Sequence, residues 1–143
     1  MGLKIEYIDA QESFGMSGPW IGNLKVENRL LKHRFLDQNY VEEKNKNLYF
    51  FNRYNPDEKE IKIFFGLFKT ITEKKKFEIL VFDSIEQKWF ISNHSWEALY
   101  LTRISKYKIF FTKAFHDGDR KMFPEQNLEF NKINFRELNY ERV

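Results

Sequence analysis

The sequence predicts a mainly β protein in which an antiparallel meander forms a twisted sandwich or a half-open barrel with one or two short helices. Short segments rich in aromatic and β-branched residues alternate with polar turns along the chain, as in β-sheet proteins. These turns recur at roughly 10–20 residues, a spacing that suits hairpins better than βαβ units. No segment rich in Pro, Gly or Ser divides the chain, so we expect residues 1–143 to form a single domain. An α+β fold is the alternative.

The N-terminal half contains three predicted strands and one strong turn. Residues 3–7 and 20–26 alternate between apolar and polar side chains, which predicts two half-buried strands. Residues 48–54 form the third, because aromatic side chains recur there with few breaks. The turn follows at residues 55–57, Asn-Pro-Asp, since Pro fixes φ and its neighbours tolerate turn geometry.

The C-terminal half contains the strands that we expect to form the core. Apolar side chains alternate over residues 61–67, and further apolar runs cover residues 77–82, 88–92 and 106–115. The segments around residues 61–68 and 79–82 are apolar on both faces, which is typical of a central strand covered on both sides. The residues expected in the core are Ile63, Phe65, Ile79, Val81, Ile109 and Phe111.

Three segments fit a helix as well as a strand. Residues 26–36 can align their apolar side chains on one face of either element. Residues 95–104 begin with Ser95, a candidate helix cap, and continue with good helix formers. Residues 131–143 show no decisive periodicity. These segments are where we expect the one or two short helices.

The composition excludes several classes of protein. Apolar residues make up 42% of the chain and charged residues 31%, which is neither a disordered nor a membrane-spanning composition. The longest apolar runs are too short for a membrane span. The absence of cysteine excludes disulfides and thiolate metal sites. The first residues lack the apolar segment of a signal peptide, so we expect a cytoplasmic protein without a membrane partner.

The net charge of +3 and the pI near 9.0 raise the question of a nucleic-acid partner. The excess is spread along the chain, because residues 1–72 carry 11 basic and 10 acidic side chains and residues 73–143 carry 13 and 11. Seventeen of the 24 basic residues are Lys, whereas Arg suits bidentate phosphate and base contacts better. Residues 46–54 and 106–111 still combine Lys with aromatic side chains. A nucleic-acid-binding β-domain that uses Lys and aromatic residues is therefore the alternative function.

No motif in the sequence fixes a reaction. Residues 116–119, His-Asp-Gly-Asp, lack the carboxylate spacing of a calcium loop, and Asp-Gly favours a hairpin turn. The histidines His33, His94 and His116 show no metal-ligand spacing. Serines such as Ser92 have no partner for nucleophilic catalysis that the sequence identifies. We expect no catalytic residue, no metal or other cofactor and no enzymatic activity.

Residues 17–31, 47–65 and 77–90 give the chain its general character, and they read SGPWIGNLKVENRLL, NLYFFNRYNPDEKEIKIFF and FEILVFDSIEQKWF. In these segments the chain resembles small bacterial immunity proteins that neutralise toxin effectors. Proteins of that kind are compact, cytoplasmic, often β-rich and without catalytic motifs. The resemblance implies a non-enzymatic factor that neutralises a partner toxin by direct binding.

The residues predicted to bind the partner are aromatic. Aromatic residues make up 18% of the chain, and protein interfaces draw their strongest contacts from Trp, Tyr and Arg. A sheet face that carried such residues beside Lys62, Lys69, Glu78 and Lys88 would suit an acidic or mixed partner surface. The predicted partner-binding residues are Phe64, Phe68, Phe82, Trp89 and Trp96.

Overall fold

The computed structural model describes residues 3–13, 18–63, 65–115 and 123–139. These residues form antiparallel strands and one four-residue helix, so the prediction of a mainly β, antiparallel fold is confirmed. The elements are β1 (Ile5–Glu12), β2 (Trp20–Val26), β3 (Arg29–Glu43), β4 (Leu48–Tyr54), β5 (Asp57–Ile63), β6 (Phe68–Lys74), β7 (Phe77–Asp83), β8 (Lys88–Ser92), β9 (Tyr100–Ser105), β10 (Lys108–Thr112), β11 (Gln126–Glu129), α1 (Phe130–Ile133) and β12 (Phe135–Leu138).

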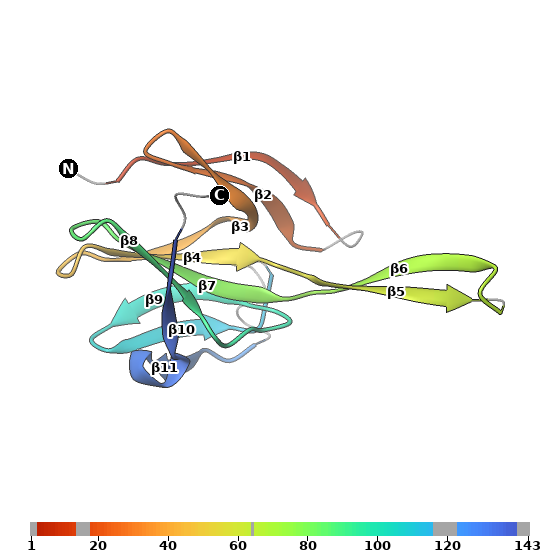
Figure 1. Cartoon of the computed structure of the whole chain (residues 1–143). Coiled ribbons are helices and arrows are strands. Elements are labelled where there is room, and N and C mark those ends of the chain that lie inside the picture. Colours follow the sequence, from red (N-terminus) through yellow and green to blue (C-terminus); the bar gives the residue numbers. More distant parts are fainter. Residues whose placement is uncertain (1–2, 14–17, 64, 116–122, 140–143) are drawn as a thin grey trace.

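The strands are arranged in three sheets (Figure 1). The largest sheet has seven strands in the order β1-β2-β3-β4-β7-β8-β12, and it stays open because β1 and β12 are edge strands. A second sheet consists of β11, β10 and β9. The third is the β5–β6 hairpin, which extends away from the other two sheets. The body is thus a sandwich, and the hairpin projects from one end of it.

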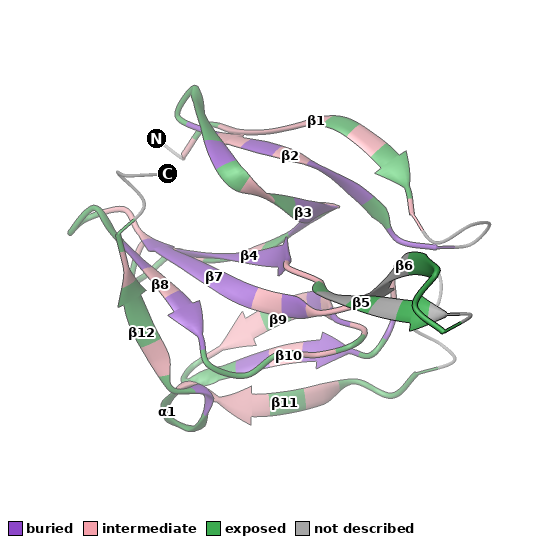
Figure 2. Cartoon of the chain, turned by 45° about the vertical axis from the view of Figure 1, so that its right-hand side comes forward, coloured by how far each residue is buried: buried purple, intermediate pink, exposed green. Residues whose placement is uncertain are grey.

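The central strands β4 and β7 are buried on both faces (Figure 2). On one face, Ile79 and Val81 belong to what we call the sandwich cluster, which also contains residues of β9 and β10. On the other face, Leu80 and Phe82 belong to what we call the N-terminal cluster, which also contains residues of β2 and β3. The expectation of a central strand over residues 79–82 that is covered on both sides is confirmed.

Strand β3 allows the N-terminal strands to fold over this central pair. Strand β3 pairs with β2 between residues 29 and 36, and with β4 at residues 34–35 and 40–43. Between Phe35 and Tyr40 the register with β4 shifts, and Gln38 within that step has a positive φ of 56°. An interruption of this kind bends a strand and increases its twist. The bend also directs Asn39 into the interior, where its side chain is buried.

Two buried asparagines join the three-stranded sheet to the larger sheet. The Asn39 side chain donates to the carbonyl of Leu101 and accepts from its N–H, both at 2.9 Å. Asn52 Nδ2 donates to Asn39 Oδ1 at 2.9 Å and to the carbonyl of Leu99 at 2.7 Å. These bonds satisfy backbone groups at the edge of β9, which has no neighbouring strand on that side in its own sheet.

Two of the three ambiguous segments contain strand and no helix. Residues 26–36 form the end of β2, a tight turn and the start of β3, with Glu27 and Asn28 both at positive φ, as a type I′ hairpin turn requires. Residues 95–104 enter β9 after an isolated bridge between Phe77 and Trp96. Only residues 131–143 contain a helix, because α1 ends at Ile133 and β12 follows it.

Part of the predicted core is correct and part is wrong. Ile79, Val81, Ile109 and Phe111 are buried, as expected. Phe65 is fully exposed, because β5 ends before it and Phe65 lies in the turn of the projecting hairpin. The side chain of Ile63 and the predicted hairpin turn at residues 116–119 lie outside the described part of the structure.

Candidate binding surface

The two most exposed large apolar side chains of the described residues, Phe65 and Leu67, lie at the end of the β5–β6 hairpin. Ile63 pairs with Phe68, so residues 64–67 connect the two strands. Phe65 and Gly66 have positive φ values of 58° and 84°, and Gly66 adopts such a φ without steric cost. Phe65 is fully exposed, Leu67 is 79% exposed and Phe68 is 59% exposed. We call residues 65–68 the hairpin tip.

Two lysines flank the hairpin tip. Lys62 and Lys69 are direct cross-strand partners, one pair behind Ile63 and Phe68. Lys69 Nζ lies 3.4 Å from Glu60 Oε1, and both side chains are well exposed. Like charges directly opposite each other destabilise a β ladder, and an exposed ion pair offsets this only weakly. The tip therefore combines apolar surface with an unfavourable concentration of positive charge.

The root of the hairpin is fixed to the body by polar contacts. The Asn55 N–H donates to the carbonyl of Lys76 at 2.9 Å, and Lys76 Nζ lies 3.1 Å from Asp57 Oδ1. Asn55 Nδ2 also donates to Glu78 Oε1 at 2.8 Å. A further ion pair joins Lys74 at the end of β6 to Glu97 on the body at 3.4 Å. Of these contacts, the hydrogen bond from Asn55 to Glu78 and the Lys74–Glu97 ion pair join the root to the body, and the exposed ion pair contributes little to stability.

The structure does not bring the five predicted partner-binding residues together. Phe82 and Trp89 are buried in the N-terminal cluster, with ring centroids 4.4 Å apart. Trp96 is half-buried and packs on the sandwich cluster. Phe68 is exposed at the hairpin tip, and Phe64 lies outside the described residues.

The charged residues predicted to surround them are also dispersed. Lys62 and Lys69 flank the tip, and Glu78 accepts a hydrogen bond from Asn55 at the root. Lys88 is the cross-strand partner of Asp83 on the body. The apolar pattern of the sequence did not identify Leu67 as a surface residue. The signal that could have done so is Gly66 within a run of Phe and Leu, because a glycine inside a strand pattern often marks a turn.

A second exposed aromatic group lies at the turn between β9 and β10. An open depression of about 620 Å³ is lined there by Lys106, Tyr107 and Lys108, among others. Tyr107 is 69% exposed, and Lys46 Nζ lies 4.4 Å from the centre of its ring. On the same sheet, Arg103 stacks on the Phe110 ring at 3.6 Å. Lysines and an exposed aromatic ring thus lie together at this turn, although the acidic Glu129 also lines the depression.

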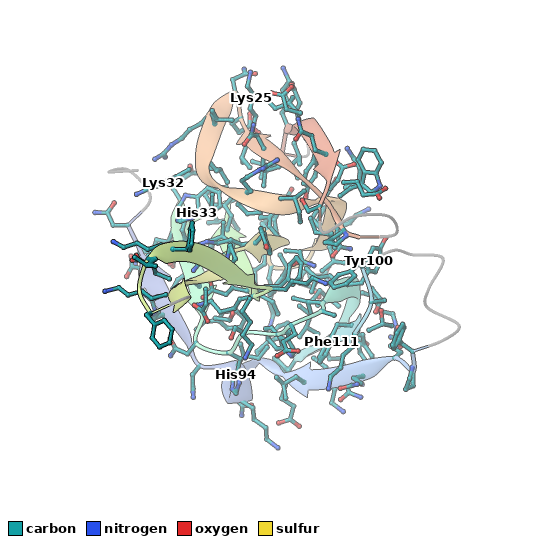
Figure 3. The ribbon with its side chains drawn as sticks, turned by 90° about the vertical axis from the view of Figure 1, so that its right-hand side faces the viewer. Lys25, Lys32, His33, His94, Tyr100 and Phe111 are labelled. Atoms are coloured by element: carbon teal, nitrogen blue, oxygen red, sulfur yellow. The ribbon has the colours of Figure 1, made fainter. Side chains whose placement is uncertain are left out.

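The side chains of Ser92 and His94 make structural hydrogen bonds. Ser92 Oγ accepts from the Ile79 N–H at 3.0 Å and donates to the carbonyl of His94 at 2.8 Å. His94 Nε2 bonds to the carbonyl of Lys132 at 3.0 Å. His33 and His94 lie in different parts of the molecule (Figure 3). Among the described residues, no three His, Asp or Glu side chains are grouped in a way that could hold a metal ion.

Strand β3 places His33 beside the buried Arg53 of β4. Arg53 Nη2 and His33 Nε2 are 2.6 Å apart, so the neutral imidazole accepts this hydrogen bond. Burial and the neighbouring Arg53 charge lower the pKa of His33 to about 4. The imidazole therefore stays neutral at physiological pH, which the hydrogen bond from Arg53 requires.

The comparisons with known proteins give no family for this chain. Within the described ranges, no helix is long and apolar enough to cross a membrane. No protein-family model matches the sequence, and neither the curated proteins nor the solved structures contain a significant match.

Proposed function

We propose that this protein is a non-enzymatic binding factor that acts in the bacterial cytoplasm as an immunity or inhibitor protein, neutralising a partner toxin by direct contact. The observation that carries the proposal is the hairpin tip, where Phe65, Leu67 and Phe68 are exposed together. Exposed apolar groups of this kind mark interaction sites. Burial of each such side chain contributes about 1.5–3 kcal/mol, which is the scale that an interface needs to offset the cost of association.

The shape of the molecule supports inhibition rather than simple adhesion. A two-stranded hairpin that projects from a sandwich is narrow enough to enter a concave site on another protein (Figure 1). Insertion of such an element can obstruct the site that it fills. The resemblance to immunity proteins in residues 47–65 includes β5 itself.

A pull-down from the native cell, combined with identification of the neighbouring gene, tests this function. We expect a neighbouring gene product to co-purify with the full-length chain, and co-expression of the chain to suppress the toxicity of that product. The chain with Ile85→Ala should behave as the wild type, because Ile85 lies in the β7–β8 turn, at the end of the molecule opposite the hairpin (Figure 1). If no protein binds and the neighbouring genes encode metabolic enzymes, the proposal fails.

Binding of single-stranded nucleic acid is the second candidate function, and the exposed Tyr107 between Lys106 and Lys108 is the observation that favours it. Bases stack on exposed aromatic rings while lysines neutralise phosphates. Such binding weakens steeply with salt, because counterions are released from the phosphates. We expect no specific binding to single-stranded DNA or RNA at physiological salt by fluorescence anisotropy. Binding that persisted there, and that Lys106→Glu with Lys108→Glu but not Lys88→Glu abolished, would make this the leading function.

A further inference from the structure

We propose that the hairpin tip inserts into an apolar socket on the partner protein and that carboxylates on the rim of this socket contact Lys62 and Lys69. This inference rests on the proposed function and adds the chemistry of the partner. It follows from the position of the tip, from the distribution of charge along the hairpin and from the isolation of the tip at its end of the molecule.

The distance from the two lysines to the end of the turn sets the depth of the socket. Lys62 pairs with Lys69, and Ile63 pairs with Phe68 one step further along. Each step along a strand covers about 3.3 Å, so the turn extends roughly 10 Å beyond the two lysines. A site that accepts the tip up to its lysines is therefore a small apolar pocket, within the size range of ordinary ligand pockets. The lysine heads then lie at the mouth of that pocket.

The charges of the hairpin favour carboxylates on the rim of the partner's socket. Residues 61–72 contain two lysines and no acidic residue, so the outer part of the hairpin carries a charge of +2. The two lysines face each other across the ladder, and Glu60 contacts only Lys69 among the ion pairs of the described residues. Carboxylates beside the docked tip relieve this repulsion and orient the complex. An apolar socket with a neutral or basic rim leaves the repulsion in place.

The hairpin fits a protein socket better than a lipid surface. A bilayer also accepts an apolar tip beside lysines, but two lysines contribute only about 1 kcal/mol each at an anionic surface, far less than a polybasic patch. At its end of the molecule the tip extends beyond every other labelled element, whereas the turns that carry Ile85 and Tyr107 lie at the opposite end (Figure 1). A flat bilayer would thus meet the tip alone. A concave protein site also encloses the strands behind it.

The test uses the full-length chain and the partner identified by the pull-down. A photoreactive benzoylphenylalanine in place of Leu67 should crosslink to one region of the partner, and the same group in place of Ile85 should not. Calorimetry should show that Leu67→Ala weakens binding at least tenfold and that Lys62→Glu with Lys69→Glu does the same. Changing the acidic residues of the crosslinked region to Lys should restore binding of the doubly reversed hairpin. Ile85→Ala is the matched exposed control.

Each of the following outcomes overturns the proposal of a socket. If the partner binds these tip variants as tightly as it binds the wild type, the protein-binding function stands and the hairpin is not its contact. If phosphatidylserine-containing vesicles sediment the wild type but not Leu67→Ala, while partner binding is unchanged, the tip binds lipid. If Leu67→Ala abolishes a concentration-dependent self-association seen by analytical ultracentrifugation and leaves partner binding unchanged, the occupant is a second copy of the chain. If no partner exists, the proposed function and this inference fail together.

Discussion

At the scale of single residues, the buried hydrogen bonds of Asn39 contribute to the stability of the fold. Its side chain is buried and bonds to both backbone polar groups of Leu101 and to Asn52. Replacing Asn39 by Leu removes the side-chain partner of both backbone groups of Leu101, whereas Asn52 keeps its hydrogen bond to the Leu99 carbonyl. Each buried backbone group left without a hydrogen bond costs about 1–3 kcal/mol. We expect Asn39→Leu to lower the free energy of unfolding by about 2–4 kcal/mol in urea titrations. The exposed Asn93→Leu is the control, and an equal loss in both variants would exclude this role.

Truncation of the single apolar side chain of Ile79 tests the assigned core. It is fully buried in the sandwich cluster. Truncation to Ala removes contacts and leaves a cavity, so we expect the free energy of unfolding to fall by about 2–4 kcal/mol. Ile85→Ala removes the same atoms from an exposed turn and should change stability by less than about 0.5 kcal/mol. Urea unfolding of both variants measures the difference, and similar losses in the two would contradict the assigned core.

His33 gives the protein a defined pH dependence. Its pKa falls from the ordinary value of 6.5, which the unfolded chain keeps, to about 4 in the folded protein, because burial and Arg53 disfavour the imidazolium. The unfolded chain therefore binds the proton first as the pH falls. The stability conferred by neutral His33 is complete above pH 6.5 and is lost as the pH falls from 6.5 to about 4.

Urea titrations at several pH values check this dependence. We expect His33→Gln to make stability less dependent on pH between 6.5 and about 4. The effect should be shallower than that of a fully buried histidine, because His33 is only half-buried. His94→Gln is the control, since His94 is exposed and bonds a backbone carbonyl. Parallel pH profiles for the wild type and His33→Gln would refute this account.

The β5–β6 hairpin is the element most separable from the rest of the fold. It forms its own sheet and is joined to the body at its root. Lys59 and Thr72 are cross-strand partners, so Asn-Gly in place of residues 60–71 can close a shorter hairpin with a two-residue turn. We expect this variant to keep its far-UV circular dichroism and to lose less than about 1 kcal/mol of stability, because the described side chains among residues 60–71 are exposed. Loss of cooperative unfolding would mean that the hairpin is part of the core.

The hairpin also marks the limit of prediction from sequence. Residues 79–82 and residues 61–68 show the same apolar pattern on both faces, and the same rule predicts a central strand for each. The first segment is central because β4 and β8 pair with it on both sides. The second pairs only within its own hairpin, so its apolar side chains at the tip face solvent. Strand pairing between distant segments decides the difference, and periodicity carries no information about it.

Prediction from sequence is limited in the same way for the polar residues of the binding surface and of the core. The turn at Glu27 and Asn28 has a local cause, and the asparagine in it was a usable signal. Asn39 bonds to Asn52 on β4 and to Leu101 on β9, the latter 62 residues further along the chain, so nothing local distinguishes it from a surface asparagine. The sequence identifies the exposed lysines that flank the tip as candidates, whereas their cross-strand contact depends on the register of β5 and β6. Strands with a clear apolar pattern were thus predictable, whereas the element type of the three ambiguous segments and the long-range pairing were not.

At the scale of the whole molecule, the two clusters share their central strands. Strand β7 provides Ile79 and Val81 to the sandwich cluster and Leu80 and Phe82 to the N-terminal cluster. Separating either layer from β7 would expose an apolar sheet face to water. The cost of exposing such a face is large relative to the stability of a small domain. Neither layer is therefore expected to unfold without the other, as a single domain requires.

The tryptophans make this cooperativity measurable. Trp89 belongs to the N-terminal cluster and Trp96 packs on the sandwich cluster, whereas Trp20 is exposed. We expect the variant Trp20→Phe with Trp96→Phe, and the variant Trp20→Phe with Trp89→Phe, each to unfold in one transition. Within each variant, the fluorescence and far-UV circular dichroism midpoints in urea should coincide, as two-state unfolding requires. The midpoints of the two variants can differ, because replacing a buried Trp leaves a cavity. A fluorescence transition that preceded the loss of β structure in either variant would show that one layer separates first.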